Sequence, residues 1–479
     1  MFLRCWLTPQ RTSIAVRTRP GSDVGSDVAY SISHIVRGVG LASIGTGLGA
    51  LLGMATIKVL AITLGPSGTG FYSLIKQLAQ ACITAATLNS QSAIVQAIAS
   101  RHEAHGRARY LGTVARPLMV AIALIVMAMM LGADQLARQI MPAVPEQFSL
   151  AIRYSAMVVV AGAAATFLAG IVNGHRAVGV LVLGQVFSGL AALVCVVPVA
   201  ALTGHHGESA VVLLLAASQT AALLVYLIWA ARRGVIGMLN PFAHATDHAT
   251  MRHFISISGT TLLTGLATAG TMLAVRALVA RTHGLDGAGL FDAAYTISAG
   301  YIGLFLGGFG TYYMPALAAI KNPADRVIFI RRMFLLTVLV STPLLAVLAL
   351  LRSPMISALY SSDYAAAAEL LRYFVVGDFL KASAWVFAYL AIAFPNMRML
   401  LACDLSWNIG FLLLGAGALT AGYPLSALGI AYALLYSIYL AAVGIYAHRV
   451  HGVTLSKSAM LLWLTGFSIV VLSAWCDWA

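Results

Sequence analysis

The chain has 479 residues, of which 60% are apolar and only 9% are Asp, Glu, Lys or Arg, and its formal net charge is +14. Soluble domains carry about 25% charged residues, so this composition excludes a soluble enzyme and a disordered chain. The basic residues stand in ones to fours between unbroken apolar runs. This pattern argues against nucleic-acid binding and against a β-barrel, and it predicts an all-α polytopic membrane protein.

Residues 1–34 are polar and contain several arginines. Because they include no hydrophobic core with a cleavage site, they do not read as a signal peptide. We expect a disordered cytoplasmic tail.

Twelve apolar segments follow, each long enough for the roughly 20 residues that a membrane span requires. They are 35–64, 71–98, 113–133, 151–173, 178–203, 210–232, 254–281, 288–319, 328–351, 371–394, 398–421 and 424–447.

These spans predict two six-helix lobes, 35–233 and 254–447, joined by a linker at 234–253 that is rich in Gly, Pro and His. Residues 448–479 form a C-terminal extension. Its apolar stretch, 459–476, is either a thirteenth span or a helix lying at the membrane interface, and we favour the span.

The basic residues predict the orientation. With the N-terminus inside, the inner segments hold 20 of the 29 Lys and Arg residues, the outer segments hold 5, and four lie within spans. Because cytoplasmic loops are enriched in Lys and Arg, this asymmetry predicts a cytoplasmic N-terminus.

A weak duplication links the two predicted lobes. Thr56–Phe71 and Ala274–Phe291 each contain a cation late in a span, then a Gly-rich outer turn, then another span. Lys58 pairs with Arg276 in this alignment. Six spans separate the copies, so both halves keep one orientation, as in a parallel repeat around a central cleft.

Ionisable groups inside spans are costly and call for an explanation. The cations are Lys58, Lys76, Arg276 and Lys381, and the clearest anions are Asp378 and Asp404. All except Asp404 are expected in the outer half of the bilayer. Two structural alternatives stay open: a lysine such as Lys76 can extend to the headgroups, and Asp378 and Lys381 can neutralise each other three residues apart.

Two spans carry polar or aromatic stripes. On the second span the stripe predicts a water-filled cavity, although polar contact between two helices is a rival explanation. Its members are Ser73, Gln77, Gln80, Thr84, Thr87 and Gln91. On the tenth span Asp378, Lys381, Trp385 and Tyr389 share an arc that is suggestive of sugar stacking, or of ordinary packing.

The sequence indicates neither a cofactor nor a metal site. Five scattered cysteines form no CxxC pair, nearly all of the twelve histidines fall in loops, and no Walker-type phosphate loop occurs. We therefore expect no catalytic residues.

Together these residues resemble the Wzx-type flippases of lipid-linked oligosaccharides, within the multidrug/oligosaccharidyl-lipid/polysaccharide exporter superfamily. The likeness is closest to the enterobacterial-common-antigen translocase group and covers most of residues 35–447. It is carried by Lys58–Gly70, by the seventh span through Tyr312–Leu317, and most strongly by Val376–Lys381 continuing through Val386–Leu390. The longer N-terminal tail and the segment after residue 455 depart from the family pattern.

The resemblance implies a flippase in the bacterial inner membrane. It would turn an undecaprenyl-pyrophosphate-linked oligosaccharide from the cytoplasmic to the periplasmic leaflet by alternating access, for surface polysaccharides such as lipopolysaccharide O-antigen. Membrane lipid, a polysaccharide polymerase and a chain-length regulator are the implied partners, and nucleic acid is not one.

Within such a cleft, Lys58 and Arg276 are expected to bind the pyrophosphate or an acidic sugar, with Lys76 assisting. The remaining predicted substrate contacts are Gln77, Gln80, Lys381, Trp385 and Tyr389, and the predicted coupling residues are Asp378 and Asp404.

Three rivals remain. A multidrug exporter of the same superfamily would require an acidic cavity for organic cations. A membrane glycan polymerase or glycosyltransferase would require carboxylates on a sizeable loop, but the chain has only 15 Asp and Glu residues. A passive channel fits poorly with two lobes in one chain.

Overall fold

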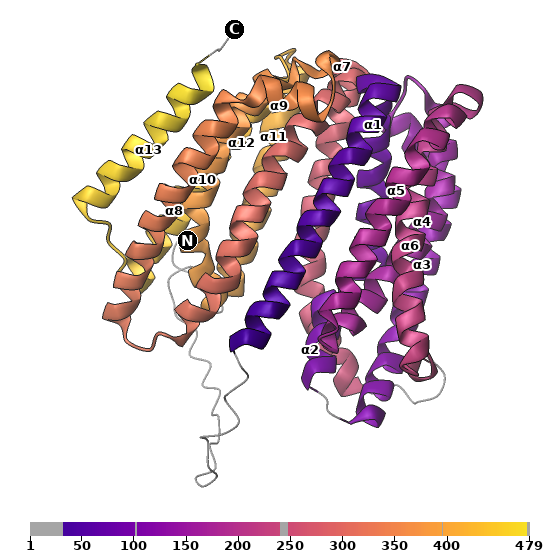
Figure 1. Ribbon diagram of the computed structural model, residues 1–479, viewed down its shortest axis with the longest axis horizontal. Coiled ribbons are helices and arrows are strands. Elements are labelled where there is room, and N and C mark those ends of the chain that lie inside the picture. The colour runs from indigo at the N-terminus through magenta and orange to yellow at the C-terminus, as the bar shows by residue number, and fades with distance from the viewer. Residues whose placement is uncertain (1–31, 101–102, 240–247, 395, 477–479) are drawn as a thin grey trace.

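A computed structural model describes residues 32–100, 103–239, 248–394 and 396–476, and all of their regular structure is helical (Figure 1). The helices are α1 (Ile32–Ala86), α2 (Gln91–Ser100), α3 (Ala104–Ile140), α4 (Pro145–Gly174), α5 (Val178–His206), η2 (Glu208–Val211), α6 (Val212–Arg232), η3 (Ile236–Leu239), α7 (His248–Ala319), α8 (Pro323–Leu350), α9 (Arg352–Leu359), η4 (Ser362–Tyr364), α10 (Ala367–Ala393), α11 (Met397–Thr420), α12 (Ser426–His451) and α13 (Lys457–Trp475).

The two longest helices are each broken once by a glycine. In α1 the break is at Gly65, with φ 64° and ψ −169°, and in α7 it is at Gly284, with φ 73° and ψ −179°. Only glycine adopts this backbone region readily, because it has no Cβ. In α1, Pro66 follows the break, and proline suits the first turn of the next helical arm. Each broken helix therefore supplies two predicted spans, with the break at the predicted turn.

Two boundaries in the N-terminal half differ from the sequence expectation. The second span was expected to continue to residue 98, but α1 ends at Ala86, and a turn with positive φ at Leu88 and Asn89 separates it from α2. Consequently Thr87 and Gln91 do not continue the polar stripe along one helix. The predicted linker also differs, since α7 begins at His248, inside the expected range. The predicted disordered tail falls largely on residues 1–31, outside the described part of the chain.

Local sequence signals start several helices. The side chain of Asn322 accepts a hydrogen bond from the Ala324 backbone N–H, and Pro323 occupies the first turn of α8. Ser456 caps α13 in the same way, through the Ala459 backbone N–H. Such caps satisfy backbone donors that have no partner within the helix.

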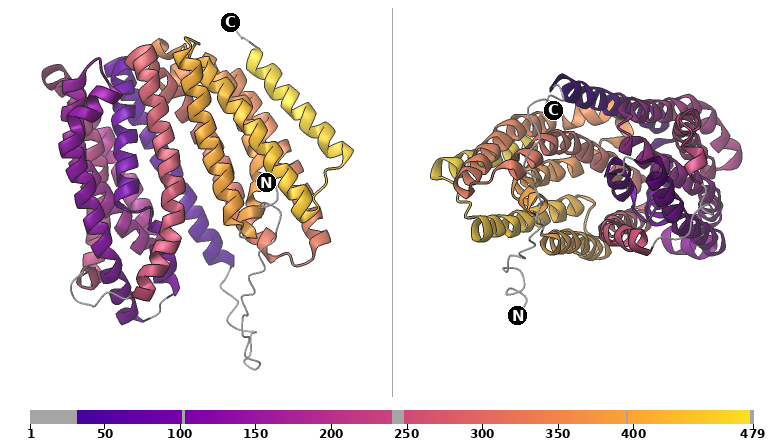
Figure 2. Two further views of the ribbon diagram at one scale, coloured as in Figure 1. Left: turned by 180° about the vertical axis from the view of Figure 1, so that it is seen from behind. Right: turned by 90° about the horizontal axis from the view of Figure 1, so that it is seen from below.

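Helices from the N-terminal and C-terminal halves of the chain form two groups that lie side by side (Figures 1 and 2). On one side are α3–α6, on the other are α8–α13, and α1 contacts α7 between them. The two glycine turns meet reciprocally. A Cβ on Gly70 would lie 2.1 Å from the Leu285 carbonyl oxygen, and one on Gly289 would lie 2.1 Å from the Pro66 carbonyl oxygen. Equivalent positions of the two sequence copies therefore contact each other.

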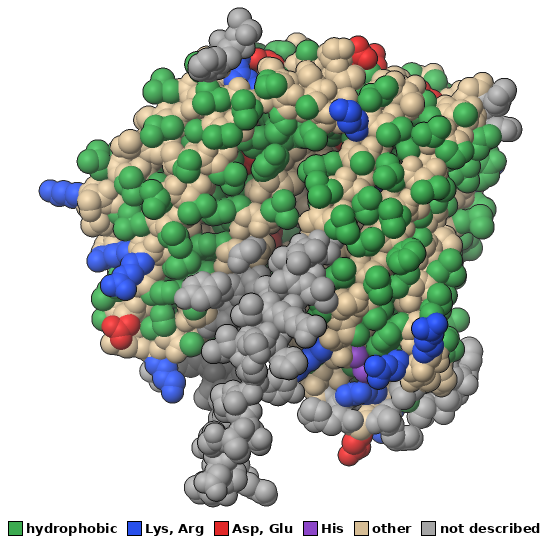
Figure 3. All heavy atoms as spheres, viewed as in Figure 1, with side chains coloured by type: hydrophobic (Ala, Val, Ile, Leu, Met, Phe, Trp, Pro, Cys, Tyr) green, Lys and Arg blue, Asp and Glu red, His purple; other side chains and the backbone are tan. Residues whose placement is uncertain are grey.

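The surface matches a membrane environment. Eleven helices among the described residues are long and apolar enough to cross a bilayer, and α13 is one of them. Large apolar side chains such as Leu131, Met157 and Leu472 are 70–81% exposed. On the face shown in Figure 3, apolar side chains cover the middle, and most Lys and Arg side chains lie in the lower half, toward the end where α1 begins.

Candidate functional site

A pocket of about 470 Å³ opens inside the N-terminal half, and we call it the N-half pocket. Its walls come from both arms of α1 and from α4, α5 and α6. One face of the second arm of α1 contributes Tyr72, Lys76 and Gln80. The polar residues opposite are Gln185 and Ser188 of α5 and Ser218 and Gln219 of α6. Lys76 is the one charged residue in the pocket lining.

Most of these polar groups have no protein partner. In the part of the chain that the structure describes, the side chains of Lys76, Gln80, Gln185 and Gln219 make no hydrogen bond or ion pair. The Lys76 Nζ lies 6.0 Å from the centre of the Tyr72 ring. Unpaired amides and ammonium groups are costly away from water. The pocket is thus suited to water or to a polar ligand.

The polar stripe of the second predicted span divides between two environments. Gln80 faces the N-half pocket, as the cavity interpretation predicts. Ser73 is buried, and its hydroxyl donates to the Gly70 carbonyl oxygen of its own helix at 3.0 Å. The Gln77 Nε2 donates a hydrogen bond to the Ala269 carbonyl oxygen at 3.1 Å, so Gln77 belongs to the contact with α7. Gln80 thus lines a pocket and Gln77 contacts another helix, while the presence of water in the pocket stays a prediction.

Arg276 is buried and already has polar partners. Its guanidinium donates to the Asp292 carboxylate at 2.7 and 3.2 Å and to Gln77 Oε1 at 3.1 Å. The ion pair joins the two arms of α7, and the exposed fractions of the two side chains are 7% and 18%. The rings of Tyr295 and Phe291 lie 5.5 and 5.7 Å from the guanidinium carbon. Its charge is therefore compensated within the protein.

Lys58, which pairs with Arg276 in the sequence repeat, lies in different surroundings. Its side chain is exposed, and its Nζ donates a hydrogen bond to the carbonyl oxygen of Ala358 in α9. It does not line the N-half pocket, which the neighbouring Ile57 does. Of the three cations predicted to bind an anion, Lys76 alone faces this pocket.

Asp378 is fully buried in the C-terminal half and binds two hydroxyl groups. Ser298 donates to one carboxylate oxygen at 2.7 Å, and Tyr432 donates to the other at 2.8 Å. The Lys381 Nζ lies 5.4 Å from the centre of the Tyr436 ring. No ion pair joins Asp378 to Lys381 within the described residues, so each has its own contacts.

The other predicted site residues lie apart from the N-half pocket. Tyr389 is buried, its hydroxyl donates to the Leu306 carbonyl oxygen at 3.4 Å, and its ring contacts Trp385 at a centroid distance of 5.5 Å. These two rings therefore contact each other, as the packing interpretation expects. Asp404 is half-buried on α11, where its backbone carbonyl accepts a hydrogen bond from Asn408.

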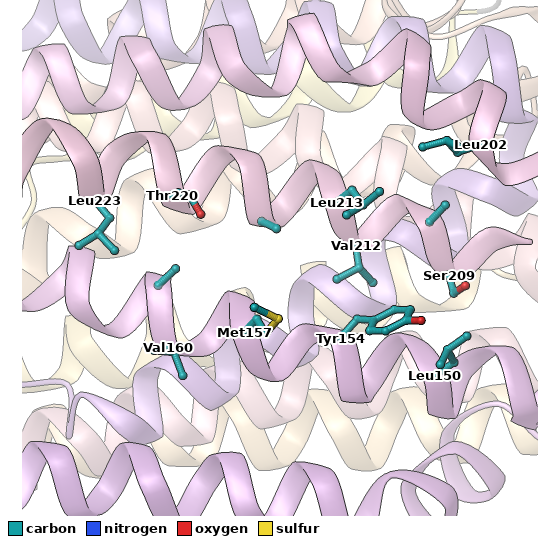
Figure 4. A pocket seen from close by; sticks show the side chains of 13 residues that line it. Leu150, Tyr154, Met157, Val160, Leu202, Ser209, Val212, Leu213, Thr220 and Leu223 are labelled. Carbon is teal, nitrogen blue, oxygen red and sulfur yellow. The ribbon is translucent and has the colours of Figure 1, made fainter. Parts of the chain in front are cut away.

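A second, larger cavity has different chemistry. It is a groove of about 760 Å³ between α4 and α6, lined by apolar residues such as Met157, Val160, Leu213 and Leu223 (Figure 4). The side chains of Met157 and Leu213 are exposed on the molecular surface. The residues that line the groove include no Lys or Arg, so the groove offers no cation to an anionic headgroup. No cluster of His, Cys, Asp or Glu suited to a metal ion occurs among the described residues.

Sequence reasoning missed several of these groups. Asp292 and Arg276 stand eight residues on either side of Gly284, so a hairpin at that glycine brings them together. That equal spacing was a readable signal. Ser298, Tyr432, Gln185 and Gln219 were not singled out from the sequence. Gln219 stands between Ser218 and Thr220, so a polar neighbour on each side was a weak signal for this glutamine.

Comparison with known proteins identifies the family. Residues 35–321, more than half of the chain, match the model of the polysaccharide biosynthesis protein family, and the chain belongs to that family. The lipid III flippase of Escherichia coli (strain K12) is 24% identical over 365 residues, which cover 75% of this chain and 84% of that protein.

Solved structures show the same fold. An inward-facing multidrug resistance MATE family transporter of the MOP superfamily aligns with a TM-score of 0.68 at 14% identity, covering 89% of this chain and 95% of the transporter. The lipid II flippase MurJ, in an inward closed conformation, aligns with a TM-score of 0.65 at 13% identity, covering 91% and 93%. The chain therefore has a transporter fold of the MATE and MurJ type.

Proposed function

We propose that this member of the polysaccharide biosynthesis protein family is a flippase for an undecaprenyl-pyrophosphate-linked oligosaccharide. It would act in the bacterial inner membrane, with a cytoplasmic N-terminus, and supply the assembly of a surface polysaccharide such as lipopolysaccharide O-antigen. The family match and the likeness to a lipid III flippase support this class of cargo. A polysaccharide polymerase and a chain-length regulator are its proposed partners.

The observation that carries the proposal is the charge of the N-half pocket. Its charged lining residue is a lysine, without an ion-pair partner in the described structure, among glutamine and serine side chains. A lipid pyrophosphate cannot cross hydrocarbon unaided, because transferring charge out of water is costly. An accessible ammonium in a polar pocket offers compensating charge, while the polyprenyl tail stays in the surrounding lipid.

The roles proposed for the predicted site residues follow from their surroundings. Lys76 and Gln80 contact the headgroup first, because they face the pocket. Arg276, with Gln77, forms a second anion-binding position, which a phosphate reaches by competing with Asp292. Lys58 acts at the Gly65 end, near α9. For Asp378, Lys381 and Asp404 we propose that a change of side-chain charge alters the transport cycle.

The contacts between the two halves indicate which end of the molecule is closed to the cargo. Beyond the reciprocal glycine contacts, the Tyr364 hydroxyl donates to the Gly65 carbonyl oxygen at 2.9 Å and lies 2.6 Å from the Thr69 hydroxyl. These contacts join η4 of the C-terminal half to the α1 turn. In the proposed orientation, these contacts lie at the periplasmic end and close it. The conformation described would then be one with a closed periplasmic side, which alternating access requires.

A multidrug exporter is the rival function, and the MATE fold is compatible with it. Organic cations would favour a pocket lined by carboxylates, which the N-half pocket does not have. Growth inhibition by cationic dyes separates the two functions: a strain that lacks the gene should show unchanged sensitivity if the cargo is an anionic lipid.

Removal of the gene also identifies the cargo. Mass spectrometry of the lipid extract should then reveal an accumulated undecaprenyl-pyrophosphate-linked glycan, which disappears when the wild-type gene is restored. An extract without such a lipid, from a strain that has become sensitive to cationic dyes, would favour the exporter.

A further inference from the structure

The polar groups of the N-half pocket lie on opposite walls with different chemistry. The α1 wall carries the ammonium of Lys76, and the α5 and α6 wall carries two carboxamides and two hydroxyls. The Ser188 and Ser218 hydroxyls are 2.6 Å apart and link α5 to α6. Each hydroxyl keeps hydrogen-bonding capacity beyond this contact, because a hydroxyl donates once and accepts twice.

The carboxamides are free to bind a ligand. Gln185 is exposed and Gln219 is half-buried, and neither side chain has a hydrogen-bond partner among the described residues. Gln80 on the opposite wall is also unpartnered. A carboxamide offers two donors and an acceptor, so these three groups match a molecule that presents many hydroxyls or amides at close spacing.

The size of the pocket limits what it can hold. At about 470 Å³ it falls within the roughly 300–1,000 Å³ of small-ligand sites. A pocket of this size accommodates one or a few sugar residues and not a long glycan. The ligand portion must also place an anion beside its hydroxyls, because Lys76 and the carboxamides face one cavity. In a lipid-pyrophosphate-linked glycan, that combination occurs where the first sugar joins the phosphate.

We propose that the N-half pocket recognises the phosphate-linked sugar of the cargo, with Lys76 on the phosphate and Gln80, Gln185, Gln219 and the Ser188–Ser218 pair on the sugar. This inference rests on the proposed function and adds a specificity to it. A site built to hydrogen-bond a ligand discriminates strongly against one that lacks those groups, because its own polar groups are then left unpaired. The α5 and α6 wall thus selects the first sugar.

Binding to the full chain in lipid nanodiscs tests the inference. The probes are undecaprenyl pyrophosphate without a sugar and undecaprenyl-pyrophosphoryl monosaccharides bearing glucose, galactose or N-acetylglucosamine. Wild-type protein should bind at least one sugar-bearing probe about tenfold more tightly than the sugar-free probe. The double variant Gln185→Leu, Gln219→Leu should lose that preference and keep its affinity for the sugar-free probe.

Two further variants complete the design. Lys76→Gln should weaken binding of the sugar-free and sugar-bearing probes to the same extent, since both carry the pyrophosphate. Gln96→Leu, on the exposed surface of α2 outside the pocket, is the matched control and should bind like wild type. Because the two pocket glutamines have no protein partners, their replacement by leucine should leave thermal unfolding unchanged.

The outcomes separate this inference from the function on which it rests. Wild-type protein that transports the cellular lipid-linked glycan, but binds all probes equally, would overturn the sugar site and leave the flippase standing. Retention of the sugar preference in the double glutamine variant would overturn the α5 and α6 assignment. If Lys76→Gln left binding of the sugar-free probe unchanged, the assignment of Lys76 to the phosphate would be overturned. Protein that bound none of the probes and transported no lipid-linked glycan would overturn both.

Discussion

Individual charges in this chain differ sharply in what compensates them. Arg276 is paired with Asp292 inside the protein, Asp378 is held by two hydroxyls, and Lys76 faces a polar pocket without a polar partner among the described residues. A charge without a protein partner in a membrane helix needs water or a ligand. This difference makes Lys76 the first candidate for the anion of the cargo, ahead of Arg276.

The Arg276–Asp292 pair predicts a specific pattern of stability. Removing one partner of a buried ion pair leaves an uncompensated charge and costs about 3–5 kcal/mol. Arg276→Met and Asp292→Leu should each lower the thermal unfolding temperature, and the double variant should recover much of the loss. Unfolding of the purified variants in detergent measures this. Losses that simply add in the double variant would show that the two charges do not depend on each other.

The separate contacts of Asp378 and Lys381 predict the outcome of exchanging their charges. Asp378→Lys combined with Lys381→Asp should remain inactive although the protein reaches the membrane, because Ser298 and Tyr432 then face a cation. Transport and membrane abundance are measured for both single variants and for the exchange. Partial recovery in the exchange would mean that mutual neutralisation is their main role.

At the scale of elements, the broken helices α1 and α7 organise the molecule. Each turns at a glycine with positive φ, and the two turns contact each other through Gly70 and Gly289. The sequence predicted these turns because a Gly-rich segment interrupts a long apolar run. The end of α1 at Ala86 was not predicted, although polar residues at 87 and 89–92 interrupt the apolar pattern there and asparagine, present at position 89, tolerates positive φ. Leu88 also has positive φ, which its residue type does not predict.

The close contact of the turns predicts that two glycines of α7 differ in how well they tolerate substitution by alanine. A methyl group at Gly289 would lie 2.1 Å from the Pro66 carbonyl oxygen, whereas one at Gly300 meets no atom within 4 Å. Gly289→Ala should therefore separate the two turns and reduce both transport and thermal stability. Gly300→Ala is the matched control and should be neutral, or more stable by up to about 1 kcal/mol. Equal tolerance of both substitutions would contradict the packed turn.

For the whole molecule, composition and long apolar runs were sufficient to predict an all-helical membrane protein, whereas the transporter fold was expected from the internal repeat and from the resemblance to a flippase family. Long apolar runs are determined by the bilayer itself, so they are readable without tertiary information. Pocket-lining residues were less predictable. Gln80 and Lys76 stood out on one helix, but Gln185 and Gln219 became relevant only when α5 and α6 were placed opposite α1.

The distribution of basic residues predicts the topology. Reporter fusions within residues 99–112 and 320–327 should be cytoplasmic, and a fusion within 203–208 should be periplasmic, because the inner segments carry 20 of the 29 Lys and Arg residues. Reporter activity and protease protection measure each position. Opposite labelling of any two positions would invalidate the orientation proposed for the pocket and the closed end.

Reconstituted transport tests the central claim most directly. Purified protein is placed in liposomes that contain the undecaprenyl-pyrophosphate-linked glycan isolated from the deletion strain, and exposure of the glycan on each leaflet is followed with an impermeant glycosidase. Wild-type protein should render glycan from both leaflets accessible, and Lys76→Gln should slow this by about tenfold or more through loss of the phosphate contact. Glycan accessibility identical to that of protein-free liposomes would contradict the account.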